Sequence, residues 1–328
     1  AYEIPLRLVG SEMCIRDSRV ETTPDATHPV VLNIQGLLSN NNQPSLYSAL
    51  QPVIQGIGDV TPVPRVYNDN IFIIDGHPLT GIWEFDSYTN LEILSPRAIR
   101  MIGCFRKMIM NTAEQVGASF VLVDVGPSST IFNKIVVMSS DYIMPPCFPD
   151  FYSIASVQGL LQNVLPSWLA WRQSYINKQR AFNPQQHQID GNFVIPFYLP
   201  EDSPKLLPIL VTNFGHWRNA VTKYSTGWVE LLRNLTDSAP EIVRSTYCPM
   251  NTTHSGDRVM VLPFLRELGQ LIPICQQHHR FLSQVNEDFY RTIGRNSGDP
   301  HCELEKARHA FGRYLSLARV LQELIIVR

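Results

Sequence analysis

The sequence predicts an α/β protein with a mostly parallel, doubly wound sheet, helices flanking the sheet and a helical tail at the C-terminus. Two observations support this fold class. Short apolar runs of the kind found in buried strands recur along the chain, and stretches with helical spacing of apolar residues separate them. The chain has 328 residues, 44% of them hydrophobic, which is enough to bury one large core or one core with a small helical appendage.

Three regions differ in pattern along the chain. Residues 1–18 keep neither strand nor helix periodicity, and the run SEMCIRDS within them resembles translated adaptor sequence. We therefore expect a non-native leader over residues 1–18, an α/β domain over residues 19–275 and a helical extension over residues 276–328.

The α/β domain begins with short elements, followed by a long helix. Apolar spacing predicts a short amphipathic stretch over residues 46–54, and the run NIFIID predicts a buried strand over residues 70–75. Ser95 and Pro96 predict a helix start, because a hydroxyl caps the first turn and proline fits the first helical position. Gly117 predicts the end of that helix.

Buried strands and helices then alternate. Residues 120–124 form an apolar run of the buried-strand type, and a Gly-Pro-Ser turn follows them. The later expected elements are a short helix over residues 131–138, a strand over 142–144, a helix from Asp150 or Ser153 to Lys178, a Pro/Gln-rich excursion over 183–204, a strand over 206–212, a helix over 217–235 and a strand over 241–247. This order predicts parallel strands joined by crossover helices.

Charge and cysteine content indicate a cytoplasmic protein. Lys and Arg number 27 against 29 Asp and Glu, so the formal charge of -2 does not call for a nucleic-acid partner. The six cysteines include no CxxC pair, which suits a reducing compartment. No apolar run approaches the ~20 residues of a membrane-spanning helix, and the first residues lack the apolar core of a secretory signal.

Asp124 is the residue that the predicted fold places best for chemistry. Ligands of open parallel sheets bind beyond the carboxyl ends of the strands, and Asp124 follows an apolar run at such an end. A carboxylate there can hold magnesium through water, and the turn after it can bring backbone N–H groups close to a phosphate. The alternative is that Asp124 only caps the next turn.

Residues 120–168 resemble ParA/Soj-type partition ATPases of the MinD/ParA group. In that group a Walker B strand, a D-x-x-P-S turn, a short helix, an S-D-Y strand with a Pro-rich exit and a helix started by Phe or Tyr follow one another. The matching positions are Asp124, Pro127, Ser128, Ser140, Asp141, Tyr142, Pro145, Pro149, Phe151 and Tyr152. Weaker similarity covers Leu46–Leu50, Gly76-His77 and the strand that ends at Val211-Thr212-Asn213, and altogether the resemblance spans roughly residues 30–290.

The resemblance implies a nucleotide-binding domain of P-loop NTPase type over residues 19–275. Asp124 would be the catalytic Walker B acid and would hold Mg²⁺ through water. The other nucleotide-binding positions would be Gly126, Pro127 and Ser128 as the γ-phosphate switch, with Asn213, Pro249 and Asn251 near adenine. Such proteins use ATP and Mg²⁺, act as nucleotide-dependent homodimers and position chromosomes, plasmids or other cargo with non-specific DNA or a ParB-like partner.

The phosphate-binding loop of that group is missing from this sequence. No G-x-x-x-x-G-K-[ST] motif occurs, so neither the backbone cradle nor its lysine is present. Because that loop supplies most of the electrostatic stabilisation of the transferring phosphate, Asp124 alone should not sustain hydrolysis. We expect either an N-terminally truncated ParA-like ATPase without activity or a catalytically dead ParA-like interaction scaffold. An unrelated doubly wound enzyme is a third alternative.

Other chemistry-bearing residues have simpler explanations. Histidine and cysteine side chains near the C-terminus could be assembled into a zinc site, but their spacing fits no standard finger and surface histidines are favoured. These residues are Cys275, His278, His279, His301, Cys302 and His309. His77 is favoured as a turn residue over a general base. The arginines of the last helix, Arg308, Arg313 and Arg319, are favoured as a solvated face over a DNA contact.

Overall fold

The computed structural model divides the chain into two units. It describes residues 45–55, 64–68, 71–74, 96–126, 129–181, 188–189, 192–193, 199–212, 216–217, 220–221, 223–248, 250–251, 258–263, 286, 308 and 312. Unit 1 comprises Ala1–Asp141 and Ser167–Pro204, and unit 2 comprises Tyr142–Pro166 and Lys205–Arg328.

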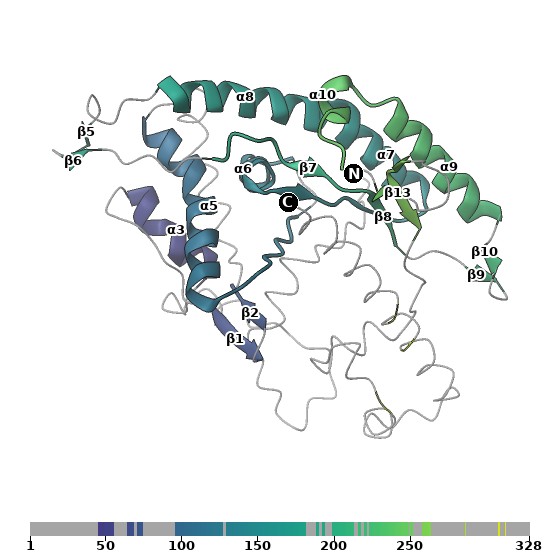
Figure 1. Ribbon diagram of the computed structural model, residues 1–328, viewed down its shortest axis with the longest axis horizontal. Helices are drawn as coiled ribbons and strands as arrows, with labels where there is room; N and C mark the ends of the chain where they lie inside the picture. Colours follow the sequence, from purple (N-terminus) through teal and green to yellow (C-terminus); the bar gives the residue numbers. More distant parts are fainter. Residues whose placement is uncertain are drawn as a thin grey trace, which may run out of the picture. The chain divides into compact units, whose positions relative to one another are not determined.

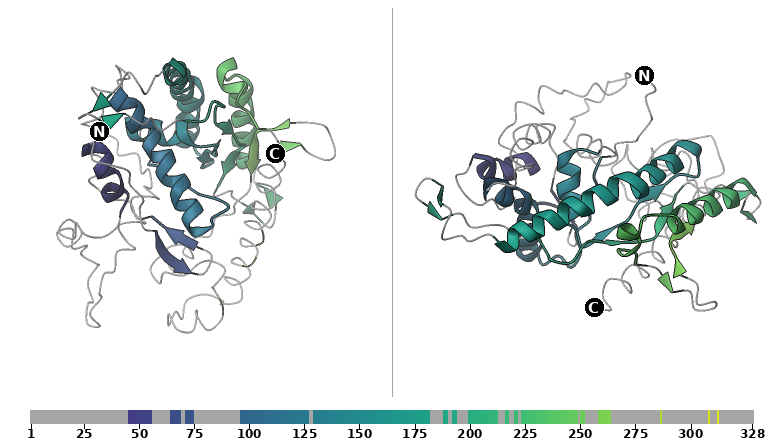
Figure 2. Two further views of the ribbon diagram at one scale, coloured as in Figure 1. Left: turned by 60° about the vertical axis from the view of Figure 1, so that its left-hand side comes forward. Right: turned by 90° about the horizontal axis from the view of Figure 1, so that it is seen from above.

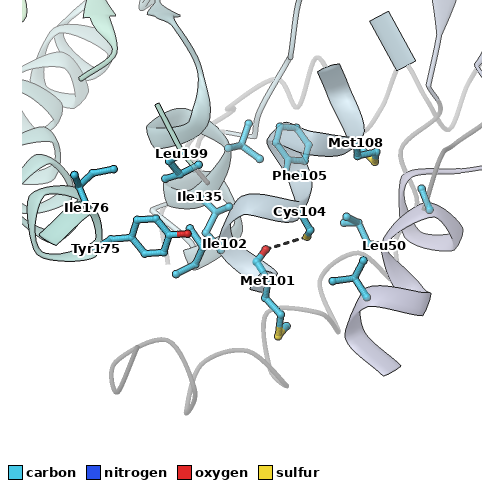
Figure 3. Packing of buried hydrophobic residues seen from close by; sticks show 13 residues of the cluster. Leu50, Met101, Ile102, Cys104, Phe105, Met108, Ile135, Tyr175, Ile176 and Leu199 are labelled. Atoms are coloured by element: carbon cyan, nitrogen blue, oxygen red, sulfur yellow. Dashed lines mark hydrogen bonds between the residues drawn. The ribbon is translucent and has the colours of Figure 1, made fainter. Parts of the chain in front are cut away.

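The described core of unit 1 is helical. Helix α3 (Leu46–Gln55) packs against α5 (Pro96–Val116), and α5 packs against α6 (Ile131–Ser139), as Figure 1 shows. Helix α8 (Leu165–Ala181) adds Tyr175 and Ile176 to the same apolar cluster. The buried side chains of this cluster, most of them labelled in Figure 3, are Ala49, Leu50, Val53, Met101, Ile102, Cys104, Phe105, Met108, Ile135, Val136, Tyr175, Ile176 and Leu199.

Aromatic contacts and a glycine define how the helices of unit 1 pack and end. Phe105 of α5 and Phe132 of α6 meet edge to face, with ring centroids 6.0 Å apart. Gly117 follows the last residue of α5 with φ of 67°, a left-handed conformation that favours glycine and ends the helix. The predicted helix start at Pro96 and its end at Gly117 are therefore confirmed.

Two small antiparallel hairpins complete the described part of unit 1. Strand β1 (Arg65–Asn68) pairs with β2 (Ile71–Ile73), and β5 (Gln188–Ile189) pairs with β6 (Asn192–Phe193). The predicted strand over residues 70–75 is confirmed as β2, but Phe72 and Ile73 are only half-buried and the strand's partner is antiparallel.

Unit 2 contains short parallel strands. Strand β8 (Ile209–Val211) lies between β4 (Pro146–Cys147) and β13 (Val261–Pro263). Strand β3 (Tyr142–Ile143) pairs in parallel with β7 (Lys205–Leu206). Backbone hydrogen bonds such as Thr212 N to the Cys147 carbonyl, at 2.8 Å, join the strands. The predicted strand over residues 142–144 is confirmed in shortened form as β3, whereas residues 206–212 are divided between β7 and β8, which belong to separate sheets.

Two antiparallel hairpins also belong to unit 2. Strand β9 (His216–Trp217) pairs with β10 (Ala220–Val221), and β11 (Met250–Asn251) pairs with β12 (Arg258–Val259). The first hairpin occupies the beginning of the predicted helix over residues 217–235. Helix α9 (Lys223–Asp237) therefore starts later than predicted.

The helices of unit 2 cover its short strands. Helix α7 (Phe151–Gly159) begins directly after its N-cap Asp150, which confirms one of the two predicted helix starts. It continues through the π-helical turn η1 (Leu160–Val164) into α8. Helix α9, the long green helix of Figure 2, packs against β13, and α7 packs against β4. The predicted strand over residues 241–247 is wrong, because Pro240 precedes a single helical turn, α10 (Glu241–Arg244), and of these residues Tyr247 alone forms a β-bridge, parallel to Leu206.

The predicted doubly wound sheet is wrong. In the described part of the chain no sheet has more than three strands, and the longest strand has four residues against 21 in the longest helix. The prediction failed because a short apolar run is equally compatible with a buried strand and with other buried or irregular structure, so apolar composition alone does not identify a strand. None of the described helices is long and apolar enough to span a membrane.

Candidate functional site

The residues predicted to bind magnesium and phosphate lie in the chain between α5 and α6. Residues 120–126 have no regular secondary structure, so Asp124 does not stand at the end of a strand. Leu122 is 93% exposed, and Phe120 is 50% exposed. The predicted buried strand over residues 120–124 is wrong, and residues 120–123 instead form an exposed apolar stretch, called the 120–123 segment below.

Both ends of the 120–123 segment are fixed on unit 1. Before it, Ala118 N donates to the Ala113 carbonyl of α5 at 2.8 Å. After it, Val125 packs against the apolar core, and Asn133 Nδ2 donates to the Gly126 carbonyl at 2.6 Å. The apolar side chains between these anchors are exposed to solvent.

The N-terminus of α6, which follows this chain segment, is closed by its own residues. The Thr130 hydroxyl accepts a hydrogen bond from Asn133 N at 3.3 Å, as an N-cap side chain does. Asn133 is only 6% exposed, and its side-chain amide holds Gly126. This asparagine therefore connects the first turn of α6 to the residue two positions after Asp124.

Asp124 does not lie at the end of a strand, where the predicted magnesium site would place it. Asp124 therefore lacks the strand that would aim it at a phosphate in a parallel sheet. The residue is exposed, but its carboxyl group is partly desolvated, and this burial raises the pKa of Asp124 above its ordinary value. No group of three His, Cys, Asp or Glu side chains among the described residues is arranged to hold a metal.

Of the other predicted site residues, the structure describes Gly126 on unit 1 together with Asp124. Four of them lie outside the described residues: Pro127, Ser128, Asn213 and Pro249. Asn251 belongs to β11 of unit 2, whereas Asp124 and Gly126 belong to unit 1. Asp124 and Gly126 lie in one segment of unit 1, and their closeness follows from the sequence alone.

The alternative candidates fall largely outside the described residues. Of the C-terminal arginines, Arg308 is described and is exposed. The candidates that the structure does not describe are His77, Cys275, His278, His279, His301, Cys302, His309, Arg313 and Arg319.

A buried arginine that sequence reasoning missed organises the C-terminal end of α6. Arg172 of α8 is 2% exposed, and its Nε donates to the Met138 carbonyl at 3.1 Å. Its two Nη atoms donate to the carbonyls of Glu201 and Asp202 at 3.2 and 2.7 Å, and to that of Pro200. Four carbonyl oxygens therefore surround one guanidinium.

A second arginine supports the same helix end. Arg106 of α5 donates through Nη1 to the Ser139 carbonyl at 2.6 Å and through Nη2 to the Asp141 carboxylate at 3.0 Å. Burial lowers the pKa of Arg172, and the positive charge of Arg106 lowers it further. Cations at a helix C-terminus complement its dipole and its unpaired carbonyls. Backbone carbonyls accept hydrogen bonds from Nε and both Nη atoms of Arg172. We therefore interpret Arg106 and Arg172 as structural residues of unit 1 and not as a ligand site.

Comparisons with known proteins leave the family of this chain unassigned. No protein-family model matches the chain, and no curated protein matches it. Among solved structures it is similar to the crystal structure of protein DIP2308 from Corynebacterium diphtheriae, with a TM-score of 0.43 and 14% sequence identity. The similarity covers 61% of this chain and 66% of that chain, slightly less than two thirds of its length. A likeness of this extent supports no conclusion about fold or activity.

Proposed function

We propose that this chain is a non-hydrolysing binding scaffold that takes up an extended peptide of a partner protein along the 120–123 segment. The observation that supports the proposal is the exposure of four consecutive apolar side chains on a segment fixed at both ends. Single exposed apolar residues are ordinary on protein surfaces, whereas a contiguous apolar stretch marks an interaction site.

The segment suits pairing with a second strand. In the part of the chain that the structure describes, no backbone hydrogen bond joins residues 120–123 to another segment. Phenylalanine and valine favour extended structure, and a peptide can add to such a segment through main-chain hydrogen bonds. Because side chains alternate along a strand, Phe120 and Leu122 would contact one side of the partner, and Val121 and Val123 the other.

The anchors on either side of the segment lower the entropic cost of binding. The hydrogen bonds of Ala118 and Gly126, and the packing of Val125, restrain the chain before a partner arrives. A segment that is restrained in advance loses less conformational entropy on association. Within the segment we expect Leu122 to contribute most of the affinity, because it is 93% exposed and so offers the most apolar surface to a partner.

The resemblance to ParA-type ATPases predicts ATP hydrolysis, a nucleotide-dependent homodimer, and DNA or a ParB-like protein as partner. These functions stay predictions. The surroundings of Asp124 favour the scaffold instead, because this acid lies in an exposed segment without regular structure and not at the end of a strand. The absent phosphate-binding motif of the sequence agrees with this preference.

A displayed library of random peptides tests the scaffold directly. Peptides selected on the parent chain should contain runs of β-branched and aromatic residues, and Leu122→Asp should weaken their binding about tenfold or more, because an apolar contact is lost. The matched control is Leu231→Asp on α9, which also replaces an exposed leucine, 41% exposed, and should bind like the parent. Selection of no peptides, or equal binding by the two variants, would refute the proposal.

Calorimetry with ATP and magnesium tests the competing prediction that Asp124 belongs to a nucleotide-binding site. We expect no binding tighter than about millimolar, and the same result for Asp124→Asn, which keeps the side-chain size and removes the acid. Micromolar binding that Asp124→Asn abolishes would instead establish a nucleotide site at this position.

A further inference from the structure

Helix α7 of unit 2 has one buried side and one exposed side. Ile154 and Val157 are 4% and 5% exposed on the side that packs in unit 2, where α7 contacts β4 and α9. The opposite side is exposed and uncharged, and it carries Phe151, Tyr152, Ala155 and Ser156. We call these four residues and Gly159 the α7 face.

The first turn of the α7 face is aromatic. Asp150 caps the helix by accepting from Ser153 N at 2.8 Å, and this fixes the position of the two residues between them. Phe151 and Tyr152 are 68% and 66% exposed and meet edge to face, with centroids 5.7 Å apart. An aromatic pair this exposed is a large apolar contact surface without a partner in the described part of the chain.

The last turn of the α7 face is open. A Cβ atom added to Gly159 would meet no other atom within 4 Å. Its φ of −58° and ψ of −41° are ordinary helical values, so the backbone does not require glycine. Together with Ala155, this glycine leaves room for another side chain or helix to approach closely.

The two ends of the α7 face complement each other in a symmetric pair. Phe151, Ala155 and Gly159 are spaced by four residues and lie along one side of the helix. If two copies of α7 pack antiparallel about a two-fold axis at Ala155, Phe151 of each copy lies over Gly159 of the other. A two-fold contact requires such self-complementarity, because the same surface serves both sides.

The charge distribution also favours a second copy of this chain as the partner of the α7 face. No Asp, Glu, Lys or Arg occurs from residue 151 to residue 171, so a two-fold axis on α7 brings no like charges together. We propose that α7 forms an antiparallel two-fold contact with α7 of a second copy of this chain, without any need for nucleotide. The contact uses unit 2 residues, so it can hold or fail independently of peptide binding at the 120–123 segment.

The exposed area sets the expected strength of the contact. Aromatic side chains bury on the order of 150–250 Å² each, so the four rings of a pair remove several hundred Å² from water. Such an area is smaller than the roughly 1,200 Å² that stable specific complexes bury, so the contact should be weak and reversible. We therefore expect a dissociation constant in roughly the micromolar range.

Sedimentation over about two decades of protein concentration tests the contact. The parent chain should shift from monomer to dimer, and Gly159→Gln should raise the dissociation constant about tenfold or more by filling the space that receives Phe151. Gly227→Gln is the matched control, since Gly227 on α9 is also helical with nothing within 4 Å of an added Cβ. A parent that stays monomeric at every concentration, or a dimer equally stable in both variants, would overturn the proposal.

Cysteine cross-linking tests the symmetry. Ala155→Cys should give a disulfide-linked dimer on mild oxidation, because the two-fold axis brings residue 155 of both copies together. Asn234→Cys, at an exposed position of α9, should remain monomeric, and the unsubstituted chain with its six cysteines gives the background. Cross-linking at residue 234 as efficient as at residue 155 would contradict an α7 contact.

Discussion

At the scale of single residues, two glycines differ in backbone conformation and not in available space. An added Cβ at Gly117 or at Gly227 meets nothing within 4 Å, but Gly117 has a φ of +67° whereas Gly227 lies inside α9. We predict that Gly117→Ala lowers the free energy of unfolding by about 1 kcal/mol, because a side chain disfavours the left-handed conformation. Gly227→Ala should raise it by about 0.5–1 kcal/mol. Urea denaturation of both variants measures the difference, and changes of the same sign would contradict the helix end at Gly117.

A buried thiol gives the second prediction at this scale. Cys147 is 3% exposed, and burial, with a smaller effect of the Asp150 charge, raises the pKa of its thiol to about 12. At a pH close to the ordinary thiol value of 9.0, iodoacetamide should therefore label half-buried Cys248 well before Cys147 in the native protein. Peptide mapping by mass spectrometry measures both rates, and denaturant should make them equal.

The same thiol predicts how stability changes with pH. Between pH 9 and about 12 the unfolded chain loses the Cys147 proton while the folded chain keeps it. Because the folded state then binds more protons, its free energy of unfolding falls as the pH rises through this window. Cys147→Ala should show a shallower fall in denaturation experiments over that range. A parallel decline in both proteins would assign the effect to other groups.

At the scale of elements, the packing of α8 in unit 1 depends on a buried arginine. Arg172 donates to the carbonyls of Met138, Glu201 and Asp202 from a position that is 2% exposed. Arg172→Met should lower the free energy of unfolding by about 3 kcal/mol, because buried carbonyls lose their donors. Arg180→Gln removes a surface ion pair from the same helix to Glu201 and should change stability little. Thermal melts of both variants test this, and equal losses would mean that Arg172 is not the structural centre of this region.

Sequence signals predicted the elements whose ends are chemically marked. Pro96 and Gly117 bound α5, and Asp150 caps α7, because a proline, a glycine or a capping carboxylate favours a particular backbone state wherever the helix packs. The parallel strands β3 and β8 were likewise predicted in outline. Local preference and tertiary packing agree at these positions.

The elements predicted wrongly are those for which only apolar composition was available. Residues 120–124 satisfy the composition of a buried strand, but no described strand pairs with them and their side chains are exposed. Residues 241–247 were expected as a strand, yet Pro240 provides a helix start and Glu241 stabilises the first turn. Composition does not determine whether a pairing partner exists, and a strand depends on that partner.

At the scale of the whole molecule, the candidate surfaces could not be predicted from sequence because they depend on which faces stay uncovered. The run FVLVD indicates burial, and only its exposure in the structure makes it a binding surface. The uncharged run from residue 151 to residue 171 was visible, but Ile154 and Phe151 are both apolar and only packing separates the buried one from the exposed one. The role of Arg172 likewise depends on carbonyl groups far along the chain, such as that of Met138.

Both exposed surfaces together predict how the native protein binds the fluorescent dye ANS, a probe of accessible apolar surface. In dilute solution Leu122→Asp and the double variant Phe151→Ser/Tyr152→Ser should each reduce the fluorescence, and their effects should add, because the surfaces use different residues in different units. As the protein concentration rises, self-association covers the α7 face, so the contribution of Phe151 and Tyr152 should decrease while that of Leu122 persists. A contribution of Leu122 that decreases in parallel would place the self-association contact on the 120–123 segment instead of α7.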